Sequence, residues 1–277
     1  MIDGVGTQTA NNGADDSKQV TLPLSDPREL ARQLGPASTR LIVLDFDGVL
    51  SPIVDRPEDA APAPGAVEAI QKLTAQTSVA VVSGRPIADL QERLGQLPVT
   101  FAGGHGAEVA HADGSIDHLA DAGEVGSVLD ALETELRGLV DDMPGWLVER
   151  KATSLAVHHR LAATESVDEH LPRVVALLER RQDEGPGFGV IAGKAVHEIR
   201  PTGVDKGRAL IRIVERLGAG NPLVVGDDVT DEDAFASGNQ LGGDAILVAE
   251  EPRPTAASFR IFDPVAVVDF LDELTQA

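Results

Sequence analysis

The stretch LIVLDFDGVL, residues 41–50, places two aspartates and a glycine directly after four aliphatic residues. A short, continuously apolar run of this kind is typical of a strand buried on both faces of a sheet. Asp45 and Asp47 follow this strand, where two desolvated carboxylates would repel each other. An ordinary acidic turn also contains Asp and Gly. Whether these aspartates form an ordinary turn or a functional site therefore depends on the residues that follow the other strands.

Similar apolar runs alternate with helical patterns on both sides of a central block. The further runs are SVAVVSGR (78–85), VTFAGG (99–104), PLVVG (222–226) and AILVA (245–249). Helical windows lie at 64–73, 86–94, 206–217 and 232–238, and a last one begins at Pro264. Continuously apolar strands separated by helices indicate a parallel sheet covered on both faces. We therefore expect an α/β fold with a doubly wound, Rossmann-like core.

The central block has a different pattern. WLVERKATSLAVHHR (146–160) and KAVHEIR (194–200) alternate polar and apolar residues, and helical windows lie near 124–140 and 166–183. Alternation is typical of strands with one polar face, so we expect an antiparallel α+β cap. The predicted organisation is a flexible tail and lead-in (1–37), a core (38–109 and 199–277) and an inserted cap domain (110–198).

Composition narrows the possible functions. The formal net charge is −22, with 45 acidic and 23 basic residues, which disfavours binding to nucleic acid because that affinity depends on Lys and Arg. The chain has no cysteine, so thiolate chemistry is excluded and a cytoplasmic setting is favoured. Residues 1–20 do not resemble a signal peptide, and no apolar window approaches the length of a membrane span. We expect no membrane partner, and a monomer is compatible with the sequence.

Polar residues follow each predicted core strand. They are Asp45, Asp47, Ser83, Arg85, the glycine turn 103–106 with His105, Asp227 and Asp228. Ligands of parallel sheets bind at the carboxyl ends of the strands. Clustered carboxylates there are compatible with Mg²⁺, which suits Asp45, Asp227 and the backbone carbonyl of Asp47.

A phosphate group would also find donors at this edge of the sheet. Ser83 offers a hydroxyl, the turn at Phe46 and Asp47 offers amides, and Lys206 brings an ammonium to a helix start. Only five lysines occur in the chain, and three lie in these segments and in the cap: Lys151, Lys194 and Lys206. Singly, Ser83 is compatible with a strand-end cap, and GDDVTDED (226–233) with an acidic helix start. Together they favour a site for a phosphorylated ligand.

Four short motifs resemble those of a known enzyme family. DFDGV (45–49), SGR (83–85), DKG (205–207) and GDDVTDEDAF (226–235), in this order, resemble the four motifs of the haloacid dehalogenase-like phosphatases. GGHGAE (103–108), ERKATSLAVHHR (149–160) and KAVHEIRP (194–201) are similar to the trehalose-6-phosphate phosphatase family, and the resemblance covers about residues 38–275. Val49 stands where Thr is frequent and His159 where Tyr is frequent, but neither position is catalytic.

The resemblance implies Mg²⁺-dependent hydrolysis of trehalose 6-phosphate, a small sugar phosphate. It implies that Asp45 is the nucleophile and Asp47 the general acid and base, kept protonated for the leaving group. Ser83 and Lys206 would stabilise the transferring phosphoryl group. The implied metal ligands are Asp45, the Asp47 carbonyl, Asp227 and Asp228, with Asp231 just beyond them.

The cap would act as a lid that binds the sugar. Expected substrate contacts are Arg85, Gly104, His105, Gly106, Glu149, Lys151, His158, Lys194, Glu198 and Arg200. Strand parity places Glu149 and Lys151 on one face, and Lys194, Glu198 and Arg200 on one face. Without the resemblance, this pattern would favour a solvated outer face with stabilising charge pairs. His105 is either a substrate contact or a structural histidine, and we expect Trp146 in the cap core.

Three alternatives remain. A related phosphatase could act on another sugar phosphate. A phosphorylated receiver module shares the sheet and the carboxylates, but is roughly half this length and has no such insertion. A non-catalytic sugar-phosphate-binding regulator would be expected to lack one of Asp45, Asp47, Lys206 or Asp227, and all four are present.

Overall fold

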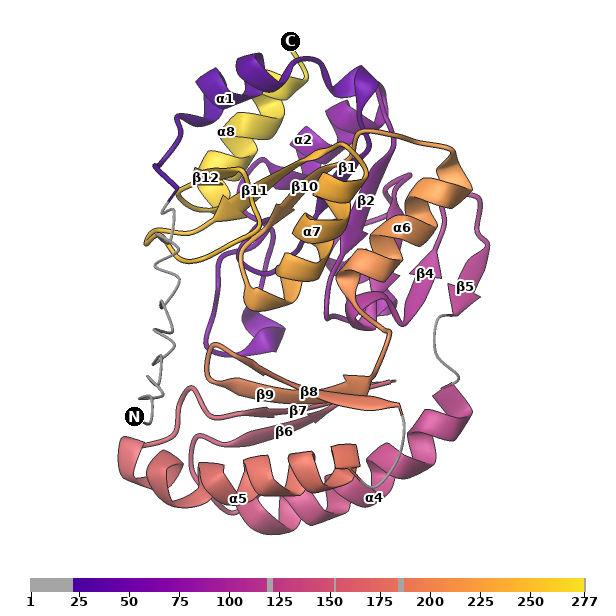
Figure 1. Cartoon of the computed structure of the whole chain (residues 1–277). Helices are drawn as coiled ribbons and strands as arrows, with labels where there is room; N and C mark the ends of the chain where they lie inside the picture. The colour runs from indigo at the N-terminus through magenta and orange to yellow at the C-terminus, as the bar shows by residue number, and fades with distance from the viewer. Residues whose placement is uncertain (1–21, 119–121, 152, 184–186, 277) are drawn as a thin grey trace, which may run out of the picture.

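The computed structural model describes residues 22–118, 122–151, 153–183 and 187–276. It contains an eight-stranded sheet flanked by helices and a separate four-stranded sheet with two helices on its outer side (Figure 1). The first unit is the core, and the second is the cap that we expected from the alternating central block.

The core sheet has the strand order β12-β11-β10-β1-β2-β3-β4-β5. In this order the strands are Phe259–Ile261, Asp244–Val248, Leu223–Gly226, Ile42–Leu44, Val79–Val82, Thr100–Gly103, Glu108–Ala110 and Ile116–His118. All pairings from β12 to β3 are parallel, whereas β4 and β5 are antiparallel. The predicted parallel α/β core is confirmed.

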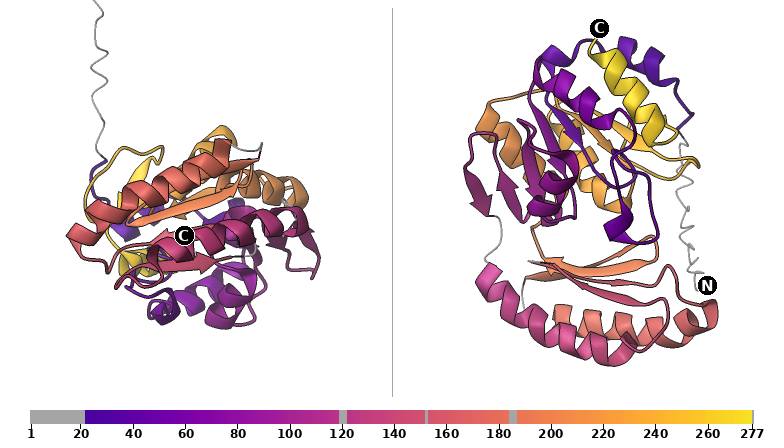
Figure 2. Two further views of the ribbon diagram at one scale, coloured as in Figure 1. Left: turned by 90° about the horizontal axis from the view of Figure 1, so that it is seen from below. Right: turned by 180° about the vertical axis from the view of Figure 1, so that it is seen from behind.

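Helices cover both faces of this sheet because its strands are apolar on both faces. Ile42 and Leu44 contribute to one hydrophobic cluster and Leu41 and Val43 to the other, as the two-residue period of a strand requires. The first face carries α1 (Pro27–Leu34), α2 (Ala66–Thr74), α3 (Ile87–Leu94) and α8 (Pro264–Leu274). The second carries α6 (Lys206–Leu217) and α7 (Glu232–Gln240). The view from behind in Figure 2 shows the indigo α1 beside the yellow α8.

The helix α1 departs from the expected flexible lead-in. Asp26 caps it by accepting hydrogen bonds from two backbone amides, and Pro27 occupies its first turn. Leu30 and Ala31 are buried, and α1 packs against α8, which makes this segment part of the core. Residues 1–20, where we expected a tail, lie outside the described residues.

The cap consists of a sheet and two long helices. The sheet has the order β6-β7-β9-β8 and is antiparallel throughout. Its elements are α4 (Ala122–Val140), β6 (Leu147–Arg150), β7 (Leu155–His158), α5 (Thr164–Asp183), β8 (Phe188–Gly193) and β9 (Val196–Pro201). Leu155, Val157 and Ile199 pack with the helices, and Trp146 joins this cluster. The opposite face of the sheet, which carries Glu198, is turned toward the core (Figure 1).

The two sheets divide the chain at slightly different residues from those expected. β5 still belongs to the core sheet at His118, and β9 remains in the cap sheet to Pro201. The expected boundaries were 110 and 198. The difference arises because β4 turns back onto β3 before the chain leaves the core.

Short 3₁₀ turns complete the described elements. They are η1 (Ala37–Thr39), η2 (Pro57–Asp59), η3 (Gly104–Gly106) and η4 (Val229–Asp231). Within the described ranges, no helix combines the length and apolar character needed to cross a bilayer.

Candidate active site

Three buried carboxylates meet at the carboxyl ends of two neighbouring core strands. Asp45 follows β1, Asp227 follows β10, and Asp231 lies in η4. One oxygen from each lies within 4.8 Å of the others, and the three residues are between 2% and 6% exposed. The parallel pairing of β1 with β10 brings together residues that are about 180 positions apart in the sequence.

Lys206 is the cation of this cluster. It begins α6, and its Nζ lies 2.8 Å from Asp45 Oδ2 and 2.7 Å from Asp231 Oδ1. Burial alone would lower the pKa of Lys206, but the two carboxylates more than offset this, so its pKa is raised. The ammonium group therefore stays charged beside the candidate nucleophile.

The ammonium groups of Lys206 and of Lys194, which lies 3.4 Å from Asp227 Oδ2, do not balance the three carboxylates. Burial raises the pKa of Asp45 well above its ordinary value, with Lys206 opposing this and Asp231 and Asp227 adding to it. Burial and the charge of Asp231 raise the pKa of Asp227 to about 7. Such a set of hard oxygen ligands with excess negative charge is suited to a divalent cation such as Mg²⁺.

The hydrogen bonds indicate which oxygens could bind the cation. Both oxygens of Asp231 are engaged, because Oδ1 accepts from Lys206 and Oδ2 accepts from the amides of Asp227 (2.9 Å) and Asp228 (3.0 Å). Asp228 Oδ1 is buried without a hydrogen-bond partner among the described residues. Asp45 is engaged in the same way, because its Oδ1 accepts from the Phe46 amide at 2.6 Å and its Oδ2 pairs with Lys206. The grouped carboxylates of Asp45, Asp227 and Asp231, with Asp228 beside them, fit a divalent cation, and Asp231 also orients the loop.

Gly48 allows the loop after β1 to approach this cluster. Its φ is +75°, and a Cβ atom built on it would lie 2.3 Å from Asp227 Cγ. Both the left-handed backbone and the close approach require glycine. The glycine of the DFDGV motif therefore brings the loop directly against Asp227.

Ser83 and Arg85 follow β2, the strand next to β1. Ser83 is 1% exposed, and its Oγ accepts the Arg85 amide at 3.3 Å. The Arg85 side chain is engaged by Asp47: Nε donates to Oδ2 at 2.7 Å and Nη2 to Oδ1 at 2.8 Å. It also donates to Asp89 at 2.8 Å and to the Pro57 carbonyl at 3.0 Å.

The structure therefore places Arg85, expected among the substrate contacts, on the candidate general acid. Asp47 and Arg85 end adjacent strands, which accounts for this pairing, but no local pattern in the sequence indicates it. Both Asp47 oxygens are engaged.

On the cap side, Glu198 is the centre of a buried polar cluster. Its Oε2 lies 3.0 Å from His105 Nε2, and its Oε1 lies 3.3 Å from Lys151 Nζ and 2.5 Å from Ser154 Oγ. Burial would raise the pKa of Glu198, but the charges of His105 and Lys151 hold it well below its ordinary value. The His105 contact joins the cap to the core, and Ser154 is a member that sequence reasoning missed although it lies within ERKATSLAVHHR.

The loop that carries His105 is tightly folded. Gly104, His105 and Gly106 all have positive φ, with His105 at 57°. A Cβ atom on Gly106 would lie 2.6 Å from Ala209 Cβ, so glycine is needed there by packing as well as by backbone conformation. The two glycines therefore shape the loop, and His105 makes the side-chain contact.

Other expected cap residues lie around this cluster. His158 Nε2 is 2.8 Å from Glu149 Oε2, and Lys151 Nζ is 4.0 Å from the same oxygen. Lys194 lies in the turn between β8 and β9, contrary to the expected strand, and its Nζ is 3.4 Å from Asp227 Oδ2. The turn thus brings a cap lysine to the carboxylate cluster of the core.

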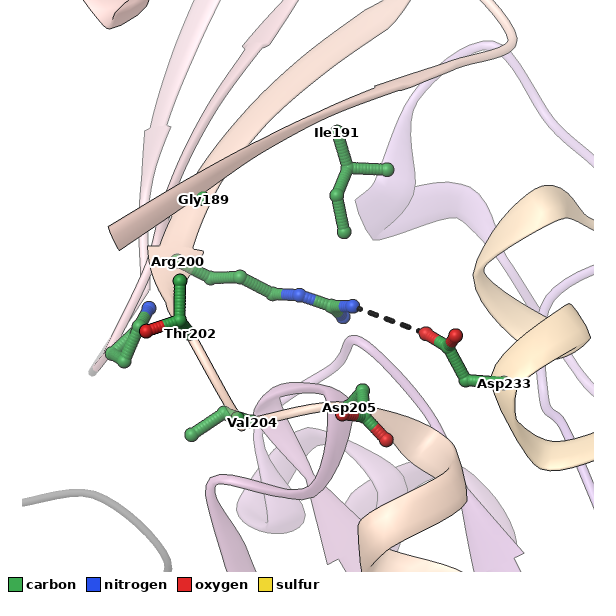
Figure 3. Close-up of a pocket in the computed structure, with 9 residues that line it drawn as sticks. Gly189, Ile191, Arg200, Thr202, Val204, Asp205 and Asp233 are labelled. Carbon is green, nitrogen blue, oxygen red and sulfur yellow. Dashed lines mark ion pairs between the residues drawn. The ribbon is translucent and has the colours of Figure 1, made fainter. Parts of the chain in front are cut away.

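Arg200 lies apart from these residues, at the end of β9. Its Nη2 is 3.6 Å from Asp233 Oδ2, and the two side chains face each other across a pocket (Figure 3). The pocket has a volume of about 190 Å³, and its wall includes Ile191 and Asp205. Arg200 therefore bridges cap and core beside the linker into α6.

The arrangement of a parallel core and an inserted cap is that of the haloacid dehalogenase-like fold, and comparisons with known proteins agree. The C-terminal domain of trehalose-6-phosphate phosphatase from C. albicans matches with a TM-score of 0.79 and 25% identity, covering 94% of this chain and 99% of that one. An Aspergillus fumigatus trehalose-6-phosphate phosphatase structure matches with a TM-score of 0.61 and 27% identity, covering 92% and 99%. The core, with its cap, is thus a known enzyme architecture.

The family follows from the sequence comparisons. A family model described as Trehalose-phosphatase matches residues 43–264, and the chain belongs to this family. The trehalose-phosphate phosphatase of Mycobacterium leprae is 38% identical over 251 residues, which cover 85% of this chain and 57% of the relative. That of Mycobacterium tuberculosis H37Rv is 38% identical over 244 residues, covering 85% and 61%. The chain thus spans about three fifths of the length of these curated relatives.

Proposed function

We propose that this chain is a Mg²⁺-dependent phosphatase that hydrolyses trehalose 6-phosphate to trehalose and phosphate. The contact of Lys206 with Asp45, beside Asp227, is the observation that carries this proposal. Membership of the trehalose-phosphatase family and the names of its relatives support the substrate. The absence of cysteine supports a cytoplasmic reaction, and a single chain supplies every residue named below.

In the first step, a carboxylate oxygen of Asp45 attacks phosphorus. The bond from phosphorus to the sugar oxygen breaks as the bond to Asp45 forms, which gives an aspartyl phosphate. Asp47 donates a proton to the departing sugar oxygen, so trehalose leaves as a neutral alcohol. Arg85 donates to both Asp47 oxygens, which is the contact of an ionised carboxylate. Before this transfer, Asp47 must therefore release Arg85 and take up a proton from solvent.

In the second step, Asp47 accepts a proton from a water molecule. The water oxygen attacks phosphorus, the bond from phosphorus to Asp45 breaks, and phosphate leaves with Asp45 regenerated. Lys206 remains beside Asp45 through both steps and stabilises negative charge on the phosphoryl oxygens. Ser83, at the end of the adjacent strand, supplies a hydroxyl donor to the same oxygens.

The metal would be held by Asp45, Asp227, Asp228 and the Asp47 carbonyl. When bound, Mg²⁺ would offset the negative charge of the phosphate and reduce the repulsion among the carboxylates. Asp231 orients the Asp227 and Asp228 backbone through its two amide hydrogen bonds. Outer partners of this kind commonly determine how well a metal site is formed.

The inner face of the cap would bind the disaccharide. Glu149, Lys151, His158 and Glu198 present donors and acceptors there, and such groups suit the hydroxyls of a sugar. In the present arrangement, Glu198 is engaged by His105, Lys151 and Ser154. A sugar hydroxyl would take the place of one of these partners, so binding of the sugar would be coupled to a rearrangement of this buried cluster.

A panel of sugar phosphates tests this proposal. We expect phosphate release with Mg²⁺ to be at least tenfold faster, in kcat/KM, for trehalose 6-phosphate than for sucrose 6-phosphate or glucose 6-phosphate. A clear preference for another sugar phosphate would overturn the proposed substrate. Binding of trehalose 6-phosphate without any release of phosphate would indicate a regulator and overturn the proposed reaction.

A further inference from the structure

The loop of residues 227–231, which follows β10 and is called the acidic loop below, has its peptide backbone held from two opposite sides. On one side, the amides of Asp227 and Asp228 donate to Asp231 Oδ2. On the other, Nη2 of Arg253 donates to the carbonyl of Asp227 at 3.3 Å and to that of Asp228 at 2.9 Å. All four backbone polar atoms of these two residues are therefore bound by charged side chains, and the peptide that joins them is held at both ends.

Arg253 reaches this position from the connection between β11 and β12. Its Nη1 donates to Glu232 Oε1 at 2.5 Å. The other oxygen of Glu232 accepts from the Ala256 amide at 2.7 Å and from Thr255 Oγ1 at 3.2 Å. Glu232, in the first turn of α7, thus fastens the connection and aims the guanidinium group at the acidic loop.

We propose that Arg253 is a positioning residue for the metal site, an inference that rests on the proposed metal-dependent function. The direction of the Asp227 side chain follows from the orientation of the peptides on either side of it. The two ends of the guanidinium fork serve different partners, since Nη1 binds Glu232 and Nη2 binds both carbonyl oxygens. The planar fork keeps these contacts at a fixed spacing, which a single ammonium group on a flexible stem does not. Without Arg253, the Asp227 carbonyl loses its side-chain donor, and the Asp228 carbonyl keeps only the Asp231 amide at 3.1 Å. The peptide between Asp227 and Asp228 can then rotate away from the geometry that the metal requires.

A merely structural role would have a different signature. The side chains of Arg253 and Glu232 are 22% and 25% exposed, and partly exposed ion pairs contribute little to global stability. Loss of Arg253 should therefore appear in metal affinity more than in the melting temperature. Mutation of a residue that hydrogen-bonds to a metal ligand typically lowers metal affinity by about 10- to 100-fold.

Arg216 provides a matched control. Its Nη2 donates to Asp113 Oδ2 and to Ser115 Oγ, both at 2.8 Å. Like Arg253, it joins a helix of the core to a neighbouring loop through an ion pair with a carboxylate. It lies in the last turn of α6, at the opposite end of that helix from Lys206.

The test is a calorimetric titration with Mg²⁺ in the absence of substrate. We expect Arg253→Ala to raise the Kd for Mg²⁺ at least tenfold and Arg253→Lys to raise it by a smaller factor. Arg216→Ala should stay within twofold of wild type. In activity assays, the Mg²⁺ concentration for half-maximal rate should rise by the same factor, while kcat at saturating Mg²⁺ falls less than threefold.

Several results would overturn the inference. Unchanged Mg²⁺ affinity in both Arg253 variants would do so, as would an equal loss in Arg216→Ala. If Arg253→Ala fails to fold, Arg253→Lys decides the matter, and wild-type affinity in that variant contradicts the inference. Because the titration uses no sugar phosphate, a wrong substrate leaves it intact, whereas a wild-type protein that binds no Mg²⁺ would refute the proposed function itself.

Discussion

Asp227→Asn should stabilise the metal-free protein by an amount that increases with pH. Burial and the neighbouring Asp231 raise the pKa of Asp227 to about 7, whereas an unperturbed aspartate ionises near pH 3.8. Between these values the unfolded chain releases a proton that the folded protein retains. Stability from this group is therefore fully present below pH 3.8, falls as the pH rises, and is lost by about pH 7.

The size of the effect follows from the difference in pKa. About three pKa units at about 1.4 kcal/mol each correspond to about 4 kcal/mol at pH 8. Asparagine carries no charge and removes this cost. With about 2–4 °C per kcal/mol for a chain of this size, the metal-free variant should melt roughly 8–16 °C above wild type at pH 8 and close to it at pH 4.

Thermal melting followed by circular dichroism, in a chelator from pH 4 to pH 8, measures this difference. Asp142→Asn, at an exposed position, serves as the control and should follow wild type. Added Mg²⁺ should stabilise wild type and leave Asp227→Asn nearly unchanged. The reasoning is refuted if Asp227→Asn melts at or below wild type at pH 8, or if the difference does not vary with pH.

Three further substitutions test other contacts. Gly48→Ala places a Cβ atom 2.3 Å from Asp227 Cγ, so Mg²⁺ affinity measured by calorimetry should fall more than tenfold, and a wild-type value would contradict this. Lys206→Met leaves Asp45 without its ammonium partner and should lower the free energy of unfolding, measured in urea without metal, by about 3–5 kcal/mol; a loss below about 1 kcal/mol would argue against it. Glu198→Gln should raise the KM for trehalose 6-phosphate about tenfold with a smaller change in kcat, and steady-state kinetics with KM unchanged would remove Glu198 from the sugar site.

The core and the carboxylate cluster could be predicted because both depend on local patterns. Each central strand is a continuous apolar run, and the parallel arrangement of such runs determines where their ends meet. Asp45, Asp227 and Lys206 therefore converge as expected, although they are far apart in the sequence. The alternation of polar and apolar residues likewise predicted the cap sheet, and two helical windows predicted its helices.

Other features depend on contacts that no local pattern records. Lys194 continues the alternation of KAVHEIR, but the chain turns there, with Ala195 at a φ of 59°. The pairing of Arg85 with Asp47 and the reach of Arg253 to the acidic loop are settled only when separate loops pack together. Sequence patterns identify the charged residues near a site, whereas tertiary packing decides which of them pair with each other.

Phosphate release from trehalose 6-phosphate by wild type and by Asp45→Asn, with saturating Mg²⁺, tests the central claim most directly. The substitution is nearly isosteric but removes the attacking oxygen anion, and circular dichroism verifies that the variant is folded. We predict sustained release by wild type and no more than a trace by Asp45→Asn. Substantial release by a folded Asp45→Asn variant would contradict the assignment of Asp45 as the nucleophile.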